Sequence, residues 1–114
     1  MGGKRSQLLV LILVLSCMTP FVLAAAGKPQ PPQAVTIDNM QFSPSMVNVK
    51  VGDTVTWTNN DDRDHTVVAT DGSFRSENLH PGASYSYQFT KAGKFAYACS
   101  YHPRMKGIVS VADK

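Results

Sequence analysis

Cysteine is scarce in this chain of 114 residues, which contains only Cys17 and Cys99. Cys17 falls in an N-terminal segment that we expect to be removed, so Cys99 has no partner for an intramolecular disulfide. The sequence therefore excludes a small domain stapled by disulfides. A free thiol in an exported protein needs another role, and metal ligation supplies one.

Clusters of basic residues are also missing. Nine basic and eight acidic residues remain once residues 1–26 are set aside, so the rest of the chain is nearly neutral. The isoelectric point of about 9.0 for the whole chain therefore says little about partners. Without a stripe of Lys or Arg, the sequence does not indicate a nucleic-acid partner.

The first residues have the features of a secretory signal peptide. Two basic residues precede the apolar run 8–15, and small residues occupy positions 24–26. The run is too short to cross a membrane and Pro20 interrupts its extension, so we expect no membrane span. We predict a signal peptide over residues 1–26, cleaved after Ala24 or Ala26, and a periplasmic or otherwise exported protein.

The rest of the chain is expected to divide into a linker and a domain. Residues 27–33 contain three prolines and are predicted to form a flexible linker, and residues 34–114 are predicted to form one domain. Lipid attachment is an alternative to plain cleavage, because residues 14–17, Val-Leu-Ser-Cys, resemble a lipobox. Leu15 fits that pattern poorly, so we do not expect a lipid anchor at Cys17.

Helical periodicity is absent from the predicted domain. No segment holds apolar residues at helical spacing over ten positions, whereas apolar and polar residues alternate in many short segments. The expected strands are residues 34–37, 46–51, 54–58, 66–69, 84–90, 94–99 and 107–112. Seven or eight short strands separated by turn residues predict an all-β fold, either an antiparallel β-sandwich or a closed barrel.

The most informative feature is the segment 99–105, which reads Cys-Ser-Tyr-His-Pro-Arg-Met and places Cys99, His102 and Met105 at every third position. A metal that takes a thiolate, an imidazole and a thioether is soft or borderline, and the thioether points to copper. His65 is the best-placed candidate for a fourth ligand. Cys and two His with a weak axial Met form the ligand set of a blue-copper electron-transfer site.

Other interpretations of these residue types remain open. A buried Cys can behave as a small hydrophobe, and methionines most often fill apolar gaps, which suits Met40 and Met46. His80 competes with His65 but is expected to be an exposed turn residue, because Pro81 and Gly82 follow it. A zinc ion could occupy the same Cys and His ligands, and that complex would be colourless and redox-silent.

Three segments carry a resemblance to a known family. Residues 51–59, 65–67 and 93–111 together resemble a cupredoxin, and the two-residue spacings within the ligand motif resemble the amicyanin and bacterial plastocyanin-like group. The resemblance covers nearly all of the predicted domain. Tyr101 and Arg104 stand where amicyanins usually show Pro and an apolar residue, which bears on the partner rather than on copper binding.

This resemblance implies a cupredoxin-like antiparallel Greek-key β-sandwich that holds one type 1 copper ion. The implied equatorial ligands are His65, Cys99 and His102, and the implied axial ligand is Met105. The protein would be a monomer that shuttles single electrons between a redox donor and a redox acceptor, such as a cytochrome, a dehydrogenase or an oxidase.

Two other function classes are alternatives to an electron carrier. A relative of a copper oxidase or nitrite reductase would carry further histidines for additional copper centres, but the chain has three histidines and no His-x-His or Cys-His pair. Four protein ligands also leave no open position for a substrate, so we expect no enzyme. A periplasmic copper-binding or copper-delivery module is the second alternative. Such modules tend to offer exposed clusters of Cys or Met, and the predicted domain has one Cys.

Overall fold

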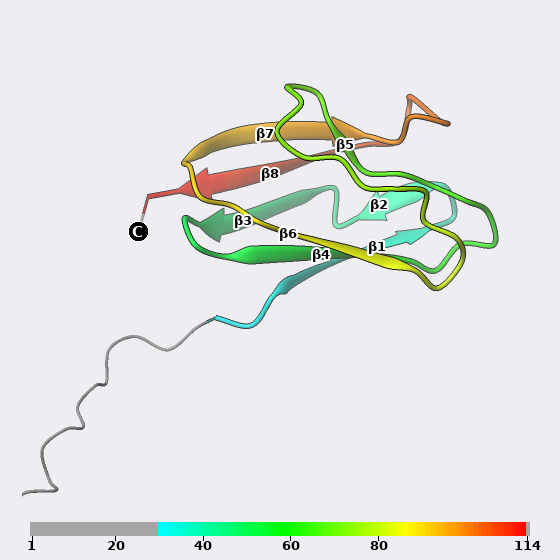
Figure 1. The fold of residues 1–114 in the computed structure, drawn as a ribbon, viewed down its shortest axis with the longest axis horizontal. Helices are drawn as coiled ribbons and strands as arrows, with labels where there is room; N and C mark the ends of the chain where they lie inside the picture. The colour runs from blue at the N-terminus through cyan, green and yellow to red at the C-terminus, as the bar shows by residue number, and fades with distance from the viewer. Residues whose placement is uncertain (1–29, 114) are drawn as a thin grey trace, which may run out of the picture.

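The computed structural model describes residues 30–113 and contains only strands and loops within them (Figure 1). The strands are β1 (Gln33–Asp38), β2 (Gln41–Ser43), β3 (Met46–Lys50), β4 (Thr54–Asn59), β5 (Val68–Ala69), β6 (Ser84–Gln88), β7 (Gly93–Ala98) and β8 (Lys106–Ala112). The predicted signal peptide, Cys17 and the first residues of the predicted linker lie outside the described residues. Among the residues that are described, no helix is long and apolar enough to cross a membrane.

The strands form two four-stranded sheets that pack face to face. One sheet has the order β2-β1-β4-β6 and the other the order β3-β8-β7-β5. The expected all-β sandwich of seven to eight strands is confirmed. The pairing is mixed rather than wholly antiparallel, because β1 lies parallel to β4 and β3 lies parallel to β8. Alternation of apolar residues fixes which side of a strand is buried but not the direction of its neighbour.

The core lies between the sheets and is filled by the inward residues of each alternating strand. Its largest fully buried side chains are Trp57 and Tyr97, whose rings meet edge to face with centroids 5.4 Å apart. Trp57 comes from β4 in one sheet and Tyr97 from β7 in the other, so this contact joins the two layers. Both residues are therefore central to the core.

Three details differ from the strands expected from sequence. β2 was not predicted, because its three residues are too short to show alternation. β5 is two residues long rather than four, since Val67 exchanges hydrogen bonds with Ser76 instead of with a neighbouring strand. Met46 was expected to fill an apolar gap, and this was wrong. Its side chain is half exposed, because the inward positions of β3 are Val47 and Val49.

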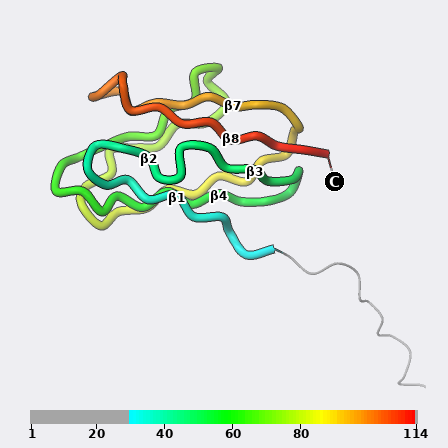
Figure 2. Tube along the Cα trace, turned by 180° about the vertical axis from the view of Figure 1, so that it is seen from behind, coloured from blue at the N-terminus to red at the C-terminus, as the bar shows by residue number. Residues whose placement is uncertain are grey.

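One end of the sandwich carries the loop that matters for function. This loop connects β7 to β8 and lies at the end opposite the C-terminus, as both views of the chain show (Figures 1 and 2). The segment between β4 and β5, which contains His65, reaches the same end. The topology therefore brings the two parts of the predicted ligand set together from distant parts of the sequence.

Candidate metal centre

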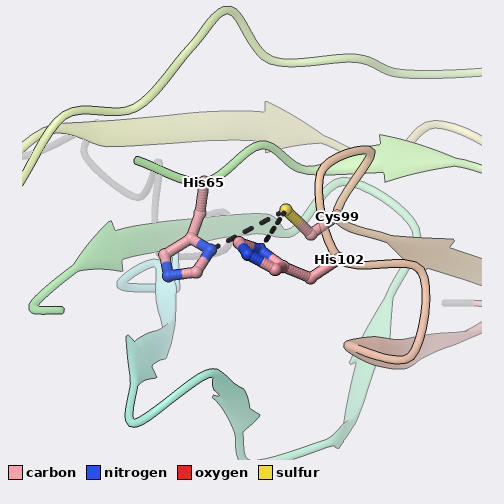
Figure 3. A group of neighbouring side chains, drawn as sticks. All are labelled: His65, Cys99 and His102. Atoms are coloured by element: carbon pink, nitrogen blue, oxygen red, sulfur yellow. Dashed lines mark hydrogen bonds between the residues drawn. The ribbon is translucent and has the colours of Figure 1, made fainter. Parts of the chain in front are cut away.

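Three of the four predicted ligand residues meet in a tight group. His65, Cys99 and His102 point toward one another at the end of the sandwich (Figure 3). The Sγ atom of Cys99 lies 3.7 Å from Nδ1 of His65 and 3.8 Å from Nδ1 of His102. One donor atom from each residue lies within 4.8 Å of the others. His65 and Cys99 are fully buried, whereas His102 is partly exposed.

The loop that holds Cys99 and His102 is closed by its own backbone. The amide of Cys99 donates to the carbonyl oxygen of Met105 at 3.2 Å, and the amide of Met105 donates to the carbonyl oxygen of His102 at 2.9 Å. These bonds turn the chain tightly between β7 and β8. Met105 is 5% exposed, so its side chain lies in the interior at the same end of the sandwich.

A second set of bonds joins this loop to the His65 segment. The Thr66 hydroxyl bonds the Ser100 hydroxyl at 2.8 Å and accepts the Ser100 amide at 2.8 Å. The Thr66 hydroxyl therefore links the His65 segment to the loop that holds Cys99. Thr66 directly follows His65 and Ser100 directly follows Cys99, so this pair of residues sets the spacing between the two ligands.

Cys99 is held in an environment that favours its thiolate. Burial alone would raise the pKa of the thiol, but hydrogen bonds from the Thr66 amide, from His65 and His102, and from the Tyr101 amide lower it to about 6. The Thr66 amide lies 3.4 Å from Sγ. Because a thiolate rather than a thiol ligates metals, the site prepares Cys99 for coordination.

A carboxylate that the sequence motif does not include, Asp61, orients His65 from the side of the ring opposite Cys99. Nε2 of His65 lies 2.9 Å from Oδ2 of Asp61. The hydrogen bond from His65, followed by one from the Met40 amide, lowers the pKa of Asp61 to about 2. An ionised Asp61 can only accept, so Nε2 of His65 carries a proton that it donates to Asp61. The Asp-x-x-x-His spacing of residues 61–65 is the sequence feature that points to this contact.

A more exposed network lies beside the group. The Tyr101 hydroxyl donates to Oδ1 of Asn78 at 2.6 Å, and Nδ2 of Asn78 donates to Oδ2 of Asp64 at 3.0 Å. Nδ1 of His80 lies 3.0 Å from Oδ1 of Asp64, and the His80 side chain is 73% exposed. His80 is thus an exposed residue outside the donor group, as expected. The network gives Tyr101 a role in holding the ligand loop against the 64–80 segment.

The donor chemistry tests whether copper fits. One thiolate and two imidazoles converge, with one donor atom from each within 4.8 Å of the others, and carboxylates take no part in the group itself. Such a set suits copper or zinc and does not suit calcium or magnesium, which require oxygen ligands. The buried thioether of Met105 on the same loop favours copper over zinc. The residues therefore fit a copper ion.

The surface over the group contains a hollow of about 480 Å³. Its wall is formed by Met40, Gln41, Tyr101, His102, Pro103, Arg104 and Met105. His102 is the partly exposed member of the donor group, so this hollow is where the group approaches solvent.

The chain matches one family model and several known proteins of the same kind. A family model described as "Cupredoxin-like domain" matches residues 7–111. Amicyanin from Paracoccus versutus is 34% identical over 94 residues, which cover 78% of this chain and 71% of the relative. Plastocyanin from Scenedesmus fuscus is 39% identical over 83 residues, which cover 61% of this chain and 85% of the relative.

A larger solved structure also resembles the chain. A copper-containing nitrite reductase from Thermus scotoductus superposes with a TM-score of 0.70 and 30% identity. The match covers 83% of this chain but 25% of the reductase chain. The similarity is therefore to one part of that larger protein.

Proposed function

The chain belongs to the cupredoxin family, and from this premise we propose that it is an electron carrier with one type 1 copper ion. The observation that carries the proposal is the convergence of the Cys99 thiolate with Nδ1 of both His65 and His102. Bound copper would supply a one-electron Cu(II)/Cu(I) couple. The remaining parts of the proposal concern what the chain does to hold and use that couple.

The proposed ligands are His65, Cys99 and His102 as the equatorial set and Met105 as the axial ligand. Support for the first three comes from their distances and from the low pKa of the Cys99 thiol. Support for Met105 is indirect. Met105 is buried at the same end of the sandwich. The hydrogen bond from its amide to the carbonyl oxygen of His102 fixes its backbone relative to that ligand.

The surroundings of the group favour electron transfer over catalysis. Four protein ligands would leave no open position, which a metal-dependent hydrolase or oxidase needs. The hydrogen bonds between His65 and Asp61 and between Thr66 and Ser100 keep the donors in place without help from a metal. A pre-formed set of donors changes little between oxidation states, so reorganisation is small and electron exchange is fast.

The setting of this activity is also part of the proposal. The predicted signal peptide over residues 1–26 would export the protein, and its partners would be a redox donor and acceptor outside the cytoplasm. They would dock where His102 approaches the surface, because the other donor residues are at most 5% exposed. A copper-delivery module is the alternative, but the buried thiolate of Cys99 disfavours rapid release of the ion to another protein.

The test is the colour of the purified protein. Addition of Cu(II) should give an intense blue or green absorption that ascorbate bleaches, since a short Cu(II)–thiolate bond gives such a band. Cys99→Ser should abolish the colour while the β-sandwich stays folded by circular dichroism. His80→Ala is the matched control, because this histidine is exposed and outside the group, and it should keep the colour. A colourless Cu(II) complex of the native protein would contradict the proposal. A native protein that binds only zinc and stays colourless would favour a zinc site instead.

A further inference from the structure

Among the four proposed ligands, His102 is the most exposed to solvent. His65 is 0% exposed, Cys99 is 1% exposed and Met105 is 5% exposed, whereas His102 is partly exposed. His102 and Met105 both line the 480 Å³ hollow. This hollow therefore offers an incoming ion a route past His102 toward Cys99.

The wall of the hollow contains a soft donor that no ligand spacing explains, Met40. It lies in the two-residue turn between β1 and β2, where Asp38 pairs with Gln41. The φ angles of Asn39 and Met40 are 54° and 61°, so both residues adopt the left-handed conformation. Turns of this kind favour Asn-Gly, and methionine at the second position is sterically disfavoured.

The position of Met40 is fixed by the same carboxylate that orients His65. The Met40 amide donates to Oδ2 of Asp61 at 3.0 Å, and Nε2 of His65 lies 2.9 Å from that same oxygen. Met40 is partly buried and lines the hollow together with His102 and Met105. The amide bond to Asp61 therefore holds the backbone of this turn, and the Met40 side chain packs against the core beside the hollow.

We propose that this hollow is the loading site through which the protein acquires its metal as Cu(I), with the Met40 thioether as the capturing donor. The inference rests on the proposed function, because it concerns how the same copper centre is filled. Thioethers and imidazoles are soft or borderline donors that suit Cu(I). Met40, His102 and Met105 offer two thioethers and one imidazole along the wall, and Cys99 lies behind them.

The step is a ligand exchange without a change of oxidation state. A lone pair on sulfur of Met40 forms a bond to Cu(I) as a donor atom of the carrier leaves it. His102 and Met105 then take the ion, and Met40 is released when the Cys99 thiolate binds. Arg104 is the charged side chain among the seven lining residues, and it is exposed at the surface of the hollow. Met40 thus captures the incoming Cu(I) ion but is not a ligand in the final copper site.

Loading kinetics test the proposal. Anaerobic protein without metal is mixed with the purple Cu(I)–bicinchoninate complex, and the loss of its colour is followed by stopped flow. Met40→Leu keeps the size and apolar character of the side chain but removes the sulfur, so loading should slow by about tenfold, the lower range for loss of a group that supports a metal. Met46→Leu is the matched control, because Met46 is half exposed but lies in β3, outside the lining of this hollow.

A second measurement separates capture from folding and from the final site. In Cys99→Ser protein labelled with ¹³C at the methionine methyl groups, Cu(I) supplied as its acetonitrile complex should shift the methyl signals of Met40 and Met105 and leave that of Met46 in place. Equal loading rates for native protein and Met40→Leu, or no shift at Met40, would overturn the loading site. Such a result with a normally coloured Cu(II) protein would leave the proposed electron-transfer function standing. Failure of the native protein to develop colour would reject that function instead.

Discussion

Asp61 lies behind His65, with its Oδ2 atom 2.9 Å from Nε2 of the imidazole and its side chain 11% exposed. The carboxylate is thus placed on the side of the ring away from Cys99. A carboxylate in this position fixes the tautomer and the ring plane of a metal-binding histidine and makes the histidine a stronger donor. The negative charge of Asp61 is therefore expected to stabilise the more positive oxidation state of a bound metal.

Asp61→Asn should raise the reduction potential of the copper protein. Asparagine keeps an oxygen that can accept from both His65 and the Met40 amide, but it removes the charge, which weakens Cu(II) more than Cu(I). A tenfold change in the relative affinities corresponds to about 59 mV for a one-electron couple. Asp62→Asn is the control, because the neighbouring Asp62 side chain is 90% exposed and paired only weakly with Arg63. Equal potentials for native protein and Asp61→Asn, measured by redox titration, would rule out this electrostatic role.

Met105 should set the potential from the axial side. Replacement by Gln supplies a harder oxygen donor that favours Cu(II), so the potential should fall. Replacement by Leu removes the donor and should raise it, by an amount of the order of 59 mV or more if the relative affinity changes tenfold. Voltammetry of both variants gives the two directions in one experiment. If both variants have the reduction potential of the native protein, Met105 is not the axial ligand.

Much of this site could be predicted from sequence because its chemistry is local. Cys99, His102 and Met105 are separated by two residues each, so their proximity needs only a tight loop. His65 is distant in sequence, yet the alternating strands on both sides predicted a sandwich whose ends bring loops together. The predicted sandwich and the convergence of His65, Cys99 and His102 were both found.

The parts that were missed depend on tertiary contacts. The parallel pairs β1–β4 and β3–β8 arise from crossings between sheets, which residue alternation does not encode. Asp61 could not be singled out from its sequence spacing alone, because its contact with His65 depends on how the loop folds back. Asn78 was missed for a similar reason, since it meets Tyr101 across 23 positions of sequence. The exposure of Met46, by contrast, was available from the sequence, because Val47 and Val49 alternate with Asn48 and Lys50 and leave Met46 on the polar side of β3.

Gly107→Ala should destabilise the fold, although Gly107 is not a ligand. A Cβ atom at this position would lie 2.3 Å from both Cζ and Oη of Tyr97, which is far inside van der Waals contact. Tyr97 is 1% exposed and packed against Trp57, so its ring has little room to move. Overpacking of this kind costs about 1–3 kcal/mol.

Denaturation of the metal-free protein measures this cost without a contribution from copper binding. The same substitution should cost less in a Tyr97→Leu background, where the ring is absent, because residues in direct contact are not additive. Equal costs of Gly107→Ala in the two backgrounds would show that the ring is not what excludes a side chain at position 107.

The last prediction concerns the surface through which the electron leaves. Pro103 and Arg104 are exposed beside His102 in the wall of the hollow, and Lys106 follows at the start of β8, so this end of the sandwich carries positive charge. A partner with an acidic docking face would be attracted there. Charges at the rim of an interface act mainly on the association rate and its salt dependence.

Arg104→Glu should therefore slow bimolecular electron transfer with such a partner at low salt, and the difference should shrink as salt screens the charges. The visible spectrum should barely change, because Arg104 is not a ligand. Lys94→Glu is the matched charge reversal, since exposed Lys94 lies near the other end of β7, away from the ligand loop. Stopped-flow rates across a salt series compare the two. An effect of Lys94→Glu as large as that of Arg104→Glu would indicate that net charge, rather than a docking site at His102, controls the encounter.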